Sequence, residues 1–418
     1  MVVRFFAGSV GPHFYMNPTL QSLPPRIALI GISGYGNIHL KLAQRFRDRG
    51  EIVIVAATVI NPEEVPADVE DLRNSGCEIF SDYEEMLKAH AGRIDLCLVP
   101  TGIHWHARMT IAALEAGANV LVEKPLSGVM CEVQAVQAAE RAASRFVAVG
   151  FQDYYEPGTA WLKQHLLNGG IGKIRSIRFL GMWPRPREYF SRNGWAGRLR
   201  IDGKAVFDSP LSNAFAHFAM LSLYFAGDTL AGVAESELID GQLWRAHAIE
   251  TFDSAVVRLR TPDEIDLWFG VTHACHDTVE PEILITGDRG TAGWRYEKEA
   301  WWCGADGVVY RRKLPDAHGA RLVMMETALR RLTDPTTMIC TSVLAGRHTQ
   351  VVESLHASIP VVDFPFDGVV WQGDGDAGIP ALVGFEAALL TANHSGSLLS
   401  TKWVDTLPST NNLKPRCN

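Results

Sequence analysis

Short apolar runs alternate with segments of helical periodicity over the first 150 residues. Residues 27–30 form one such run, and after a glycine cluster the apolar residues Ile38, Leu42 and Phe46 recur at helical spacing until Gly50. This order predicts a strand, a turn and a helix. Further apolar runs predict strands at residues 52–58, 96–99, 119–122 and 146–150. Because these runs are apolar throughout, they indicate a parallel sheet covered by helices on both faces.

After Gly150 the pattern changes to longer segments in which apolar and polar residues alternate. Residues 254–260 and 265–272 are of this kind, and turn signals follow each of them. Such alternation predicts a mostly antiparallel sheet. A helical pattern at residues 334–357 predicts a late helix.

The length of 418 residues exceeds the roughly 250–300 at which a single core stops growing, so two domains are expected. The change of pattern places the boundary near residue 150. We therefore expect a flexible extension, a dinucleotide-binding domain, a second domain that binds substrate and forms oligomer contacts, and a C-terminal tail, at residues 1–25, 26–150, 151–400 and 401–418.

Charge and cysteine usage narrow the functional classes. The chain has 39 Lys and Arg against 47 Asp and Glu, a formal net charge of −8, without a basic block, which argues against a nucleic-acid partner. Seven cysteines include no CxxC pair, so we expect free thiols in a reducing compartment and no metal site. No apolar run approaches the roughly 20 residues of a membrane helix. A cytoplasmic protein without a membrane partner is expected.

The turn after the first predicted strand reads GISGYGNIH. Gly31 and Gly36 take the first and last positions of a GxGxxG string, while Ser33 takes the middle one, with Gly34 beside it. A turn of this kind between a strand and a helix brings backbone N–H groups to a pyrophosphate, although a purely structural glycine turn is the alternative. The turn predicts NAD or NADP, contacted by Gly31, Ser33, Gly34, Tyr35, Gly36, Asn37 and Ile38.

The end of the second predicted strand does not decide between the two nucleotides. The fingerprint expects an acid there to hold the adenosine ribose, but the segment AATVINPEE has Thr58 and Asn61 in that region. It also has no Arg or Lys for a 2′-phosphate. Thr58 is the expected cofactor contact, and the choice between NAD and NADP stays open.

Residues 119–128 read NVLVEKPLSG, so a predicted strand runs directly into Glu123, Lys124 and Pro125. Ligands of open α/β sheets bind beyond the carboxyl ends of the strands, which makes these three residues candidates for a site. Taken alone, the tripeptide is more typical of a surface ion pair with a turn proline than of a functional site. The sequence around the tripeptide decides between a ligand site and a surface ion pair.

Residues 100–128, PTGIHWHARMTIAALEAGANVLVEKPLSG, resemble the Gfo/Idh/MocA family of nicotinamide-dependent oxidoreductases. That family has a TPxxxH-like turn, an ALxAGxxVxxEKP segment, and a second-domain helix bearing Asp and His four residues apart. Here the EKP segment matches fully, while Gly102 replaces the usual proline of the turn. The resemblance extends from about residue 26 to about residue 360.

The resemblance implies an α/β fold: an N-terminal Rossmann domain, which is a doubly wound parallel sheet, and a C-terminal α/β domain with a large, mostly antiparallel open sheet. It also implies a homodimer or homotetramer. Lys124 would lie beside the nicotinamide and the reacting hydroxyl, where an ammonium stabilises developing negative charge. Further cofactor contacts are expected from Thr101, Gly102, His104, His106, Glu123, Lys124, Gln152 and, in the second domain, Trp195.

The second-domain helix is expected within SPLSNAFAHFAMLSLYFAG, with Ser212 or Asn213 as its N-cap. By resemblance His217 takes the place of the family's histidine, Asn213 that of its aspartate, and Met220 that of a further aspartate. A histidine suits a base that accepts a hydroxyl proton, whereas asparagine can orient the ring but supplies no charge. We expect Lys124, Asn213 and His217 to be catalytic.

Two further segments are ambiguous. Residues 183–200 place five arginines among aromatic residues, which suits a substrate with an acidic group but also an interdomain or subunit contact. The segment THACHD at residues 272–277 resembles a metal cluster, but alternation along a strand would point its side chains apart. The expected substrate contacts are Lys124, Arg185, Asn213, His217 and His273.

The sequence thus favours an oxidoreductase that transfers a hydride between a nicotinamide cofactor and a secondary alcohol of a sugar, polyol or glycoside. One alternative is an NAD-dependent enzyme that cleaves glycosides through transient sugar oxidation. The other is a non-catalytic regulatory protein that binds NAD(P) and a sugar, an alternative that the departures from the family pattern at Asn213 and Met220 leave open.

Overall fold

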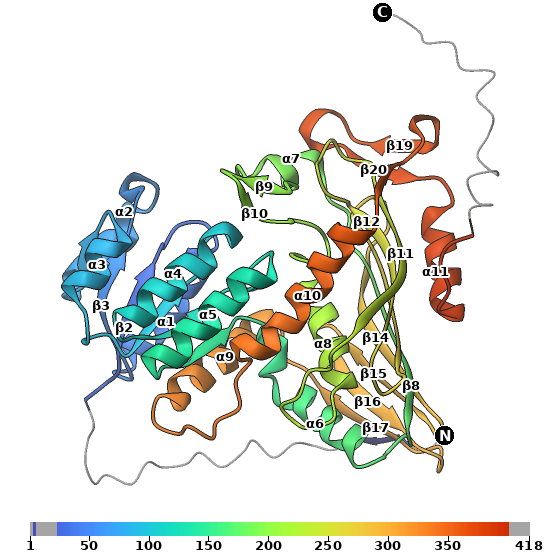
Figure 1. Ribbon diagram of the computed structural model, residues 1–418, viewed down its shortest axis with the longest axis horizontal. Coiled ribbons are helices and arrows are strands. Elements are labelled where there is room, and N and C mark those ends of the chain that lie inside the picture. Colours follow the sequence, from blue (N-terminus) through green and yellow to red (C-terminus); the bar gives the residue numbers. More distant parts are fainter. Residues whose placement is uncertain (1–2, 6–22, 401–418) are drawn as a thin grey trace, which may run out of the picture.

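The computed structural model describes residues 3–5 and 23–400, which form two lobes (Figure 1). The first lobe contains a six-stranded sheet in the order β4-β3-β2-β5-β6-β7, and every neighbouring pair is parallel. Its strands are β2 (Arg26–Ile30), β3 (Val53–Thr58), β4 (Glu78–Phe80), β5 (Leu96–Val99), β6 (Asn119–Val122) and β7 (Val147–Val149). The predicted parallel sheet is confirmed.

Helices connect these strands and cover the sheet. They are α1 (Gly36–Asp48), α2 (Pro66–Asn74), α3 (Tyr83–Ala89), α4 (Ile103–Glu115) and α5 (Met130–Ala143), with a 3-10 turn, η1 (Pro62–Glu64). The edge strand β4 was not expected from the sequence, because it has three residues and all of them are at least partly exposed. An edge strand of this length has no apolar run for the periodicity to detect.

The second lobe contains a ten-stranded sheet in the order β1-β17-β16-β15-β14-β8-β13-β12-β11-β18. Three neighbouring pairs are parallel (β1 with β17, β8 with β13, β11 with β18) and the others are antiparallel, which confirms the mostly antiparallel sheet. The strands are β1 (Val3–Phe5), β8 (Ile174–Met182), β11 (Glu237–Arg245), β12 (Ser254–Arg260), β13 (Asp266–Thr272), β14 (Val279–Gly287), β15 (Thr291–Arg295), β16 (Glu299–Cys303), β17 (Val309–Lys313) and β18 (Val361–Asp363).

Helices lie on both sides of this large sheet (Figure 1). One side carries α6 (Pro157–Leu167), α8 (Ala216–Ala226) and α10 (Ser342–Ser358), while η2 (Gln152–Tyr154) contacts α8 and α9 (Ala317–Arg331) contacts both η2 and α1 of the first lobe. On the other side, α11 (Phe385–Ser395) packs on β8 and β13 and closes a smaller apolar core that contains Trp268 and Leu389. α11 therefore covers part of this second face of the sheet.

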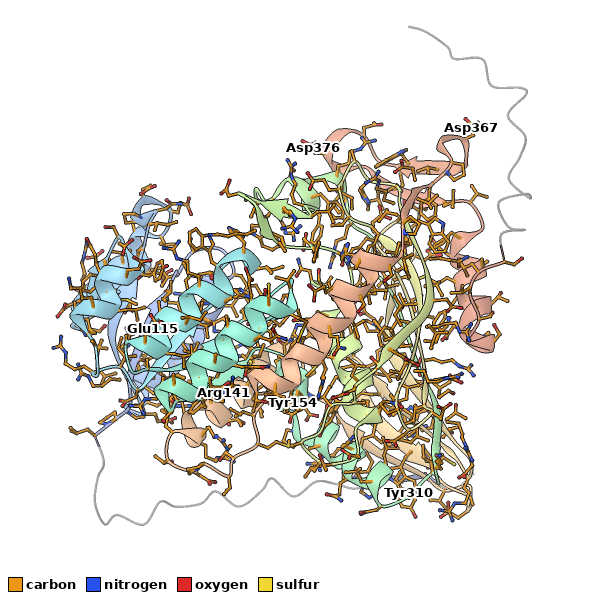
Figure 2. All side chains as sticks on the ribbon, in the orientation of Figure 1. Glu115, Arg141, Tyr154, Tyr310, Asp367 and Asp376 are labelled. Carbon is orange, nitrogen blue, oxygen red and sulfur yellow. The ribbon has the colours of Figure 1, made fainter. Side chains whose placement is uncertain are left out.

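The remaining elements lie at one end of the second lobe, at the top of Figure 1. They are α7 (Arg187–Ser191), the hairpin of β9 (Arg200–Ile201) and β10 (Lys204–Ala205), the hairpin of β19 (Val369–Gln372) and β20 (Ile379–Leu382), and the turns η3 (Phe366–Gly368) and η4 (Gly375–Ala377). Tyr154, labelled in Figure 2, lies where the lobes meet, and its ring packs edge-on against Tyr224 of α8. α10 also packs along α5, which joins the two domains.

Two expectations on element bounds need correction. The late helix, α10, begins at Ser342 rather than near Asp334, because Thr341 accepts a hydrogen bond from the backbone N–H of Leu344 and caps the helix there. The preceding helix α9 was not predicted. Residues 3–5, expected within a flexible extension, form strand β1 beside β17. The remainder of that extension up to residue 22 and the predicted tail at 401–418 lie outside the described residues.

Candidate active site

A cleft of about 1000 Å³ lies along the carboxyl ends of the parallel strands. Its lining comes from the turn after β2, the end of β3, the segments after β4, β5 and β6, and, from the second domain, Tyr189, Arg192, Asn193, Trp195 and Asn213. The crevice beyond the strand ends of a doubly wound sheet is where such folds bind dinucleotides. The cleft therefore joins a nucleotide-binding edge to residues of the second domain.

The glycine turn after β2 has the shape that a pyrophosphate requires. Gly31 has a φ of +88°, which favours glycine, and a Cβ on Gly36 would lie 2.7 Å from the carbonyl oxygen of Gly31. Only glycine at Gly36 allows the first turn of α1 to approach the strand end so closely. Gly31, Ser33, Gly34 and Tyr35 line the cleft, as the sequence predicted. The residues of the turn thus fit a bound dinucleotide.

The opposite end of the cleft carries the expected ribose contact and one carboxylate that the sequence did not reveal. Thr58 lines the cleft, although its hydroxyl donates to the Sδ atom of Met86. Asp82 also lines the cleft, and its Oδ1 caps α3 by accepting from the N–H groups of Glu84 and Glu85. Asp82 follows the unpredicted strand β4, so its approach to the end of β3 could not be foreseen.

Glu123 at the end of β6 is buried and bonded to His39 of α1. Its Oε1 lies 2.8 Å from His39 Nε2, and its Oε2 accepts from the backbone N–H of Lys124 at 3.1 Å. Burial alone would raise the pKa of Glu123, but the hydrogen bond to His39 and the charge of Lys124 outweigh it and hold this pKa below its usual value. Although Glu123 lines the cleft, its bonds show that it also fixes the start of the Lys124 turn.

Lys124 reaches from the first domain to the second. Its Nζ donates to the backbone carbonyl of Asn213 at 2.8 Å and to the side-chain Oδ1 of Asn213 at 3.1 Å. Burial lowers the pKa of Lys124, while the carboxylates of Glu123 and Asp208 oppose that shift. The Lys124–Pro125 peptide is cis, and His106 lies within hydrogen-bonding distance of the carbonyl oxygen of Pro125. The strand-end motif is therefore held in place from both domains.

Asn213 lies in the turn before α8 rather than on the helix. α8 begins at Ala216 with Phe215 as its N-cap, so neither Ser212 nor Asn213 caps it, and Asn213 and His217 do not share a helical face. The predicted helix start was wrong. The Nδ2 of Asn213 donates to Oδ1 of Asp208 at 2.8 Å, and Asp208 is buried and also accepts from the N–H of Gly197. The side chain that contacts Lys124 is therefore itself hydrogen-bonded to the carboxylate of Asp208.

His217 lies on α8, deeper than the cleft lining. Its ring packs edge-on against Phe151, and its Nδ1 lies 3.5 Å from Oδ2 of Asp153. Burial and, next, the nearby cations Lys124 and Arg321 lower the pKa of His217 well below its usual value. At neutral pH the imidazole is uncharged and can accept a proton.

Cleft-lining residues include most, but not all, of the cofactor contacts expected from the sequence. Those that line the cleft are Gly31, Ser33, Gly34, Tyr35, Thr58, Thr101, Gly102, His106, Glu123, Lys124 and Trp195. Those outside the lining are Gly36, Asn37, Ile38, His104 and Gln152; Asn37, for example, donates its Nδ2 to Asp68 of α2. The roles of individual residues toward a cofactor remain predictions.

Arg185 and His273, expected to contact substrate, make hydrogen bonds within the second domain. The ring of His273 is buried, its Nδ1 lies 2.8 Å from the carbonyl oxygen of Trp183, and its backbone carbonyl accepts from the N–H of Arg185. Neither residue lines the cleft. The THACHD segment continues beyond β13 as a bend, and no group of potential metal ligands occurs among the described residues.

Arg192 is the arginine of the 183–200 segment that does line the cleft. Its guanidinium carbon lies 3.8 Å from the centre of the Tyr189 ring and 5.4 Å from that of Trp195, and its Nη2 is 3.9 Å from Oδ2 of Asp208. Among the described lining residues, Arg192 and Lys124 are the two that carry a formal positive charge. Sequence spacing could not select it from five arginines, because α7 and the loop after it decide which one faces the cleft.

Comparison with known proteins agrees with this geometry. Residues 25–151 match the model of an oxidoreductase family with an NAD-binding Rossmann fold. The chain is 25% identical over 238 residues to myo-inositol 2-dehydrogenase of Thermotoga maritima, covering 56% of this chain and 64% of that protein. It is 30% identical over 148 residues to inositol 2-dehydrogenase of Azotobacter vinelandii, covering 35% and 42%. In both cases the match spans less than two thirds of the relative.

Solved structures share the fold across both domains. Levoglucosan dehydrogenase in complex with NADH superposes with a TM-score of 0.68 at 18% identity, covering 80% of this chain and 96% of that one. The WlbA dehydrogenase of Bordetella pertussis in complex with NADH and UDP-GlcNAcA gives 0.64 at 21% identity, with the same coverage. The first domain thus matches an oxidoreductase family with an NAD-binding Rossmann fold, and the chain shares its two-domain fold with these dehydrogenase structures.

Proposed function

We propose that the protein is an NAD(P)-dependent dehydrogenase acting on a secondary alcohol of a sugar, polyol or glycoside. The observation that carries this proposal is the meeting of Lys124 with Asn213 at the carboxyl edge of the nucleotide-binding sheet. An ammonium at that edge lies where a substrate oxygen would approach a bound nicotinamide. The inositol and levoglucosan dehydrogenases that resemble the chain support the substrate class.

Different residues stabilise charge and accept the proton in the proposed reaction. A bound nicotinamide supplies the hydride acceptor. Lys124 stabilises the negative charge that develops on the substrate oxygen, and Asn213 holds the ammonium through two acceptor oxygens. His217, which is uncharged because of its burial, accepts the hydroxyl proton.

The cleft favours NAD over NADP. Asp82 lies at the adenosine end, where a carboxylate suits a ribose hydroxyl and repels a 2′-phosphate. The two cationic residues of the lining, Lys124 and Arg192, both adjoin the second domain at the other end.

Arg192 supports a substrate that carries an acidic group. Guanidinium groups bind carboxylates and phosphates through paired hydrogen bonds, and Arg192 is the arginine that lines the cleft beside Trp195 and near the Lys124 site. A sugar acid or an acidic derivative of a polyol would place its anionic group there.

Assembly and location complete the proposal. We expect a homodimer or homotetramer in the cytoplasm, on the basis of the family resemblance and of cysteine usage. No helix among the described residues is long and apolar enough to cross a membrane.

A substrate panel with cofactor balance tests the proposal. Purified protein with NAD or NADP is mixed with myo-inositol, levoglucosan, hexoses and their aldonic and uronic acids, and NADH or NADPH formation is followed by absorbance. Reduction in proportion to substrate, lost in a Lys124→Met variant that still binds NADH, is the expected result. Product formation without net reduction would show glycoside cleavage instead, and NADH binding without turnover of any substrate would favour a regulatory protein.

A further inference from the structure

Asp153 and His217 form a buried pair behind the Lys124 site. Asp153 lies in η2, immediately after the last strand of the first domain, and His217 lies in the first turn of α8. The Oδ2 of Asp153 is 3.5 Å from the Nδ1 of His217, and the two side chains are 7% and 10% exposed. Among the described residues, neither of these atoms has a hydrogen-bond partner. Each of these two atoms is thus available to the other.

Several charged groups face this pair from other elements. Asp153 is influenced by Glu156 of its own segment, by Arg321 of α9 and by Glu297 of the β15–β16 turn. His217 is influenced by Lys124, Arg321 and His348. Burial, and next the negative charge of Glu156, raises the pKa of Asp153 to about 7. The carboxyl therefore changes its charge within the pH range in which a dehydrogenase works.

The geometry points to Asp153 as the positioning carboxylate of His217, a role that rests on the dehydrogenase function proposed above. Ionised Asp153 accepts the Nδ1–H of His217 and so holds the imidazole in the tautomer whose Nε2 carries a lone pair. Nε2 would then take the hydroxyl proton while the C–H hydride passes to the nicotinamide that a bound NAD(P) would supply, and the carboxylate would stabilise the resulting imidazolium. Asp153 of η2 thereby supplies the negative charge that Asn213 lacks.

Protonation of Asp153 reverses the tautomer. A neutral carboxyl donates its proton to Nδ1, which leaves the ring hydrogen on Nε2, where it cannot accept a proton from the substrate. Hence kcat/KM for alcohol oxidation rises as the pH increases through about 7 and Asp153 ionises. An amide at this position cannot ionise, and its NH₂ group donates to Nδ1 at every pH.

Asp153→Asn is the test, with Glu156→Gln as the matched control. Glu156 is a buried carboxylate in the same segment, but it caps α6 by accepting from the N–H of Thr159 and does not contact the imidazole. Asp153→Asn is expected to lower kcat/KM on the order of 100-fold or more and to remove its rise near neutral pH. Glu156→Gln is expected to keep the rise of kcat/KM with pH but to move its midpoint to lower pH, because the charge that raises the pKa of Asp153 is removed. KM for the alcohol should change much less than kcat in Asp153→Asn.

A readout without substrate separates this inference from the proposed function. The ¹⁵N resonances of the His217 ring, assigned by their loss in His217→Asn, report which nitrogen carries the proton. In the wild type they should move from the Nε2–H toward the Nδ1–H pattern as the pH rises through about 7, and in Asp153→Asn they should not. Unchanged ring resonances in Asp153→Asn would overturn the role of Asp153, whereas a changed tautomer in a protein that oxidises no alcohol would refute the proposed function alone.

Discussion

The buried pair of Glu123 and His39 predicts a large, pH-dependent loss of stability when the histidine is removed. His39→Leu deletes the partner of Oε1 at 2.8 Å and leaves the carboxylate with one hydrogen bond, from the N–H of Lys124 at 3.1 Å. Breaking a buried pair typically costs about 3–5 kcal/mol, because the remaining charge is left without compensation. Since one hydrogen bond and the Lys124 ammonium remain, we expect the lower end of that range, about 3 kcal/mol at pH 7.

The pH dependence follows from the charge of Glu123. In the wild type its pKa is held below the usual value, so its contribution to stability is complete above the unfolded-state pKa, near 4.3, and is lost as the pH falls through the folded value. In His39→Leu the main opposing interaction is gone, and burial raises this pKa. The stability difference between variant and wild type is therefore largest at neutral pH and narrows as the pH falls toward 5 and Glu123 takes up a proton.

Urea unfolding at pH 7 and pH 5, followed by tryptophan fluorescence, measures both effects. A His39→Leu/Glu123→Gln double variant serves as the control, because without the carboxylate the loss of His39 should cost less than it does alone. A destabilisation below about 1 kcal/mol at pH 7, or an equal one at both pH values, would show that His39 does not stabilise the charged form of Glu123.

Three further variants test other parts of the site. Gly150→Ala should lower the free energy of unfolding by about 1–3 kcal/mol, because the new Cβ would lie 2.9 Å from Oε1 of Glu123. Gly194→Ala is the control: its Cβ would have no atom closer than 3.9 Å, so thermal melts should show almost no change in stability. Arg192→Met should raise KM for acidic substrates by about tenfold or more and spare neutral polyols, while Arg185→Met should affect both equally; the reverse pattern in steady-state kinetics would assign the anion to Arg185. Asp82→Asn keeps the cap of α3 but removes a charge, so the ratio of kcat/KM with NADP to that with NAD should increase, and an unchanged ratio would contradict the placement of Asp82 at the ribose.

The first domain was largely predictable because its signals are local. A continuous apolar strand, a glycine turn and a helix follow one another within about twenty residues, and the strand that ends in Lys124 carries its motif with it. Gly36 illustrates the reason: its contact with Gly31 is five residues away in sequence, so spacing alone defines it. The fold of that domain and the position of Lys124 at the strand edge followed from such short-range patterns.

The second half of the site depends on contacts between residues far apart in sequence. Arg192 lines the cleft because α7 and the loop that follows it direct it toward the first domain. Arg185 does not line the cleft, and its backbone N–H donates to the carbonyl oxygen of His273. Asp153 meets His217 although 64 positions separate them in the numbering, since η2 packs beside α8. No periodicity within a single segment predicts such a contact, and this is why the sequence did not reveal all the residues of the second domain that line the cleft.

The substitution of asparagine for aspartate at Asn213 is best understood through the carboxylates around it. An aspartate there would form an ion pair with Lys124. Asn213 instead accepts hydrogen bonds from the ammonium at two neutral oxygens, and its side-chain NH₂ donates to Asp208. Neutral acceptors attract an ammonium less strongly than a carboxylate does, so more of the positive charge of Lys124 remains available to a substrate oxygen. The base, His217, would then depend on Asp153 rather than on residue 213. Acid–base control and oxyanion stabilisation would thus be separated between two carboxylates, and single substitutions of Asp208 and Asp153 should affect different kinetic constants.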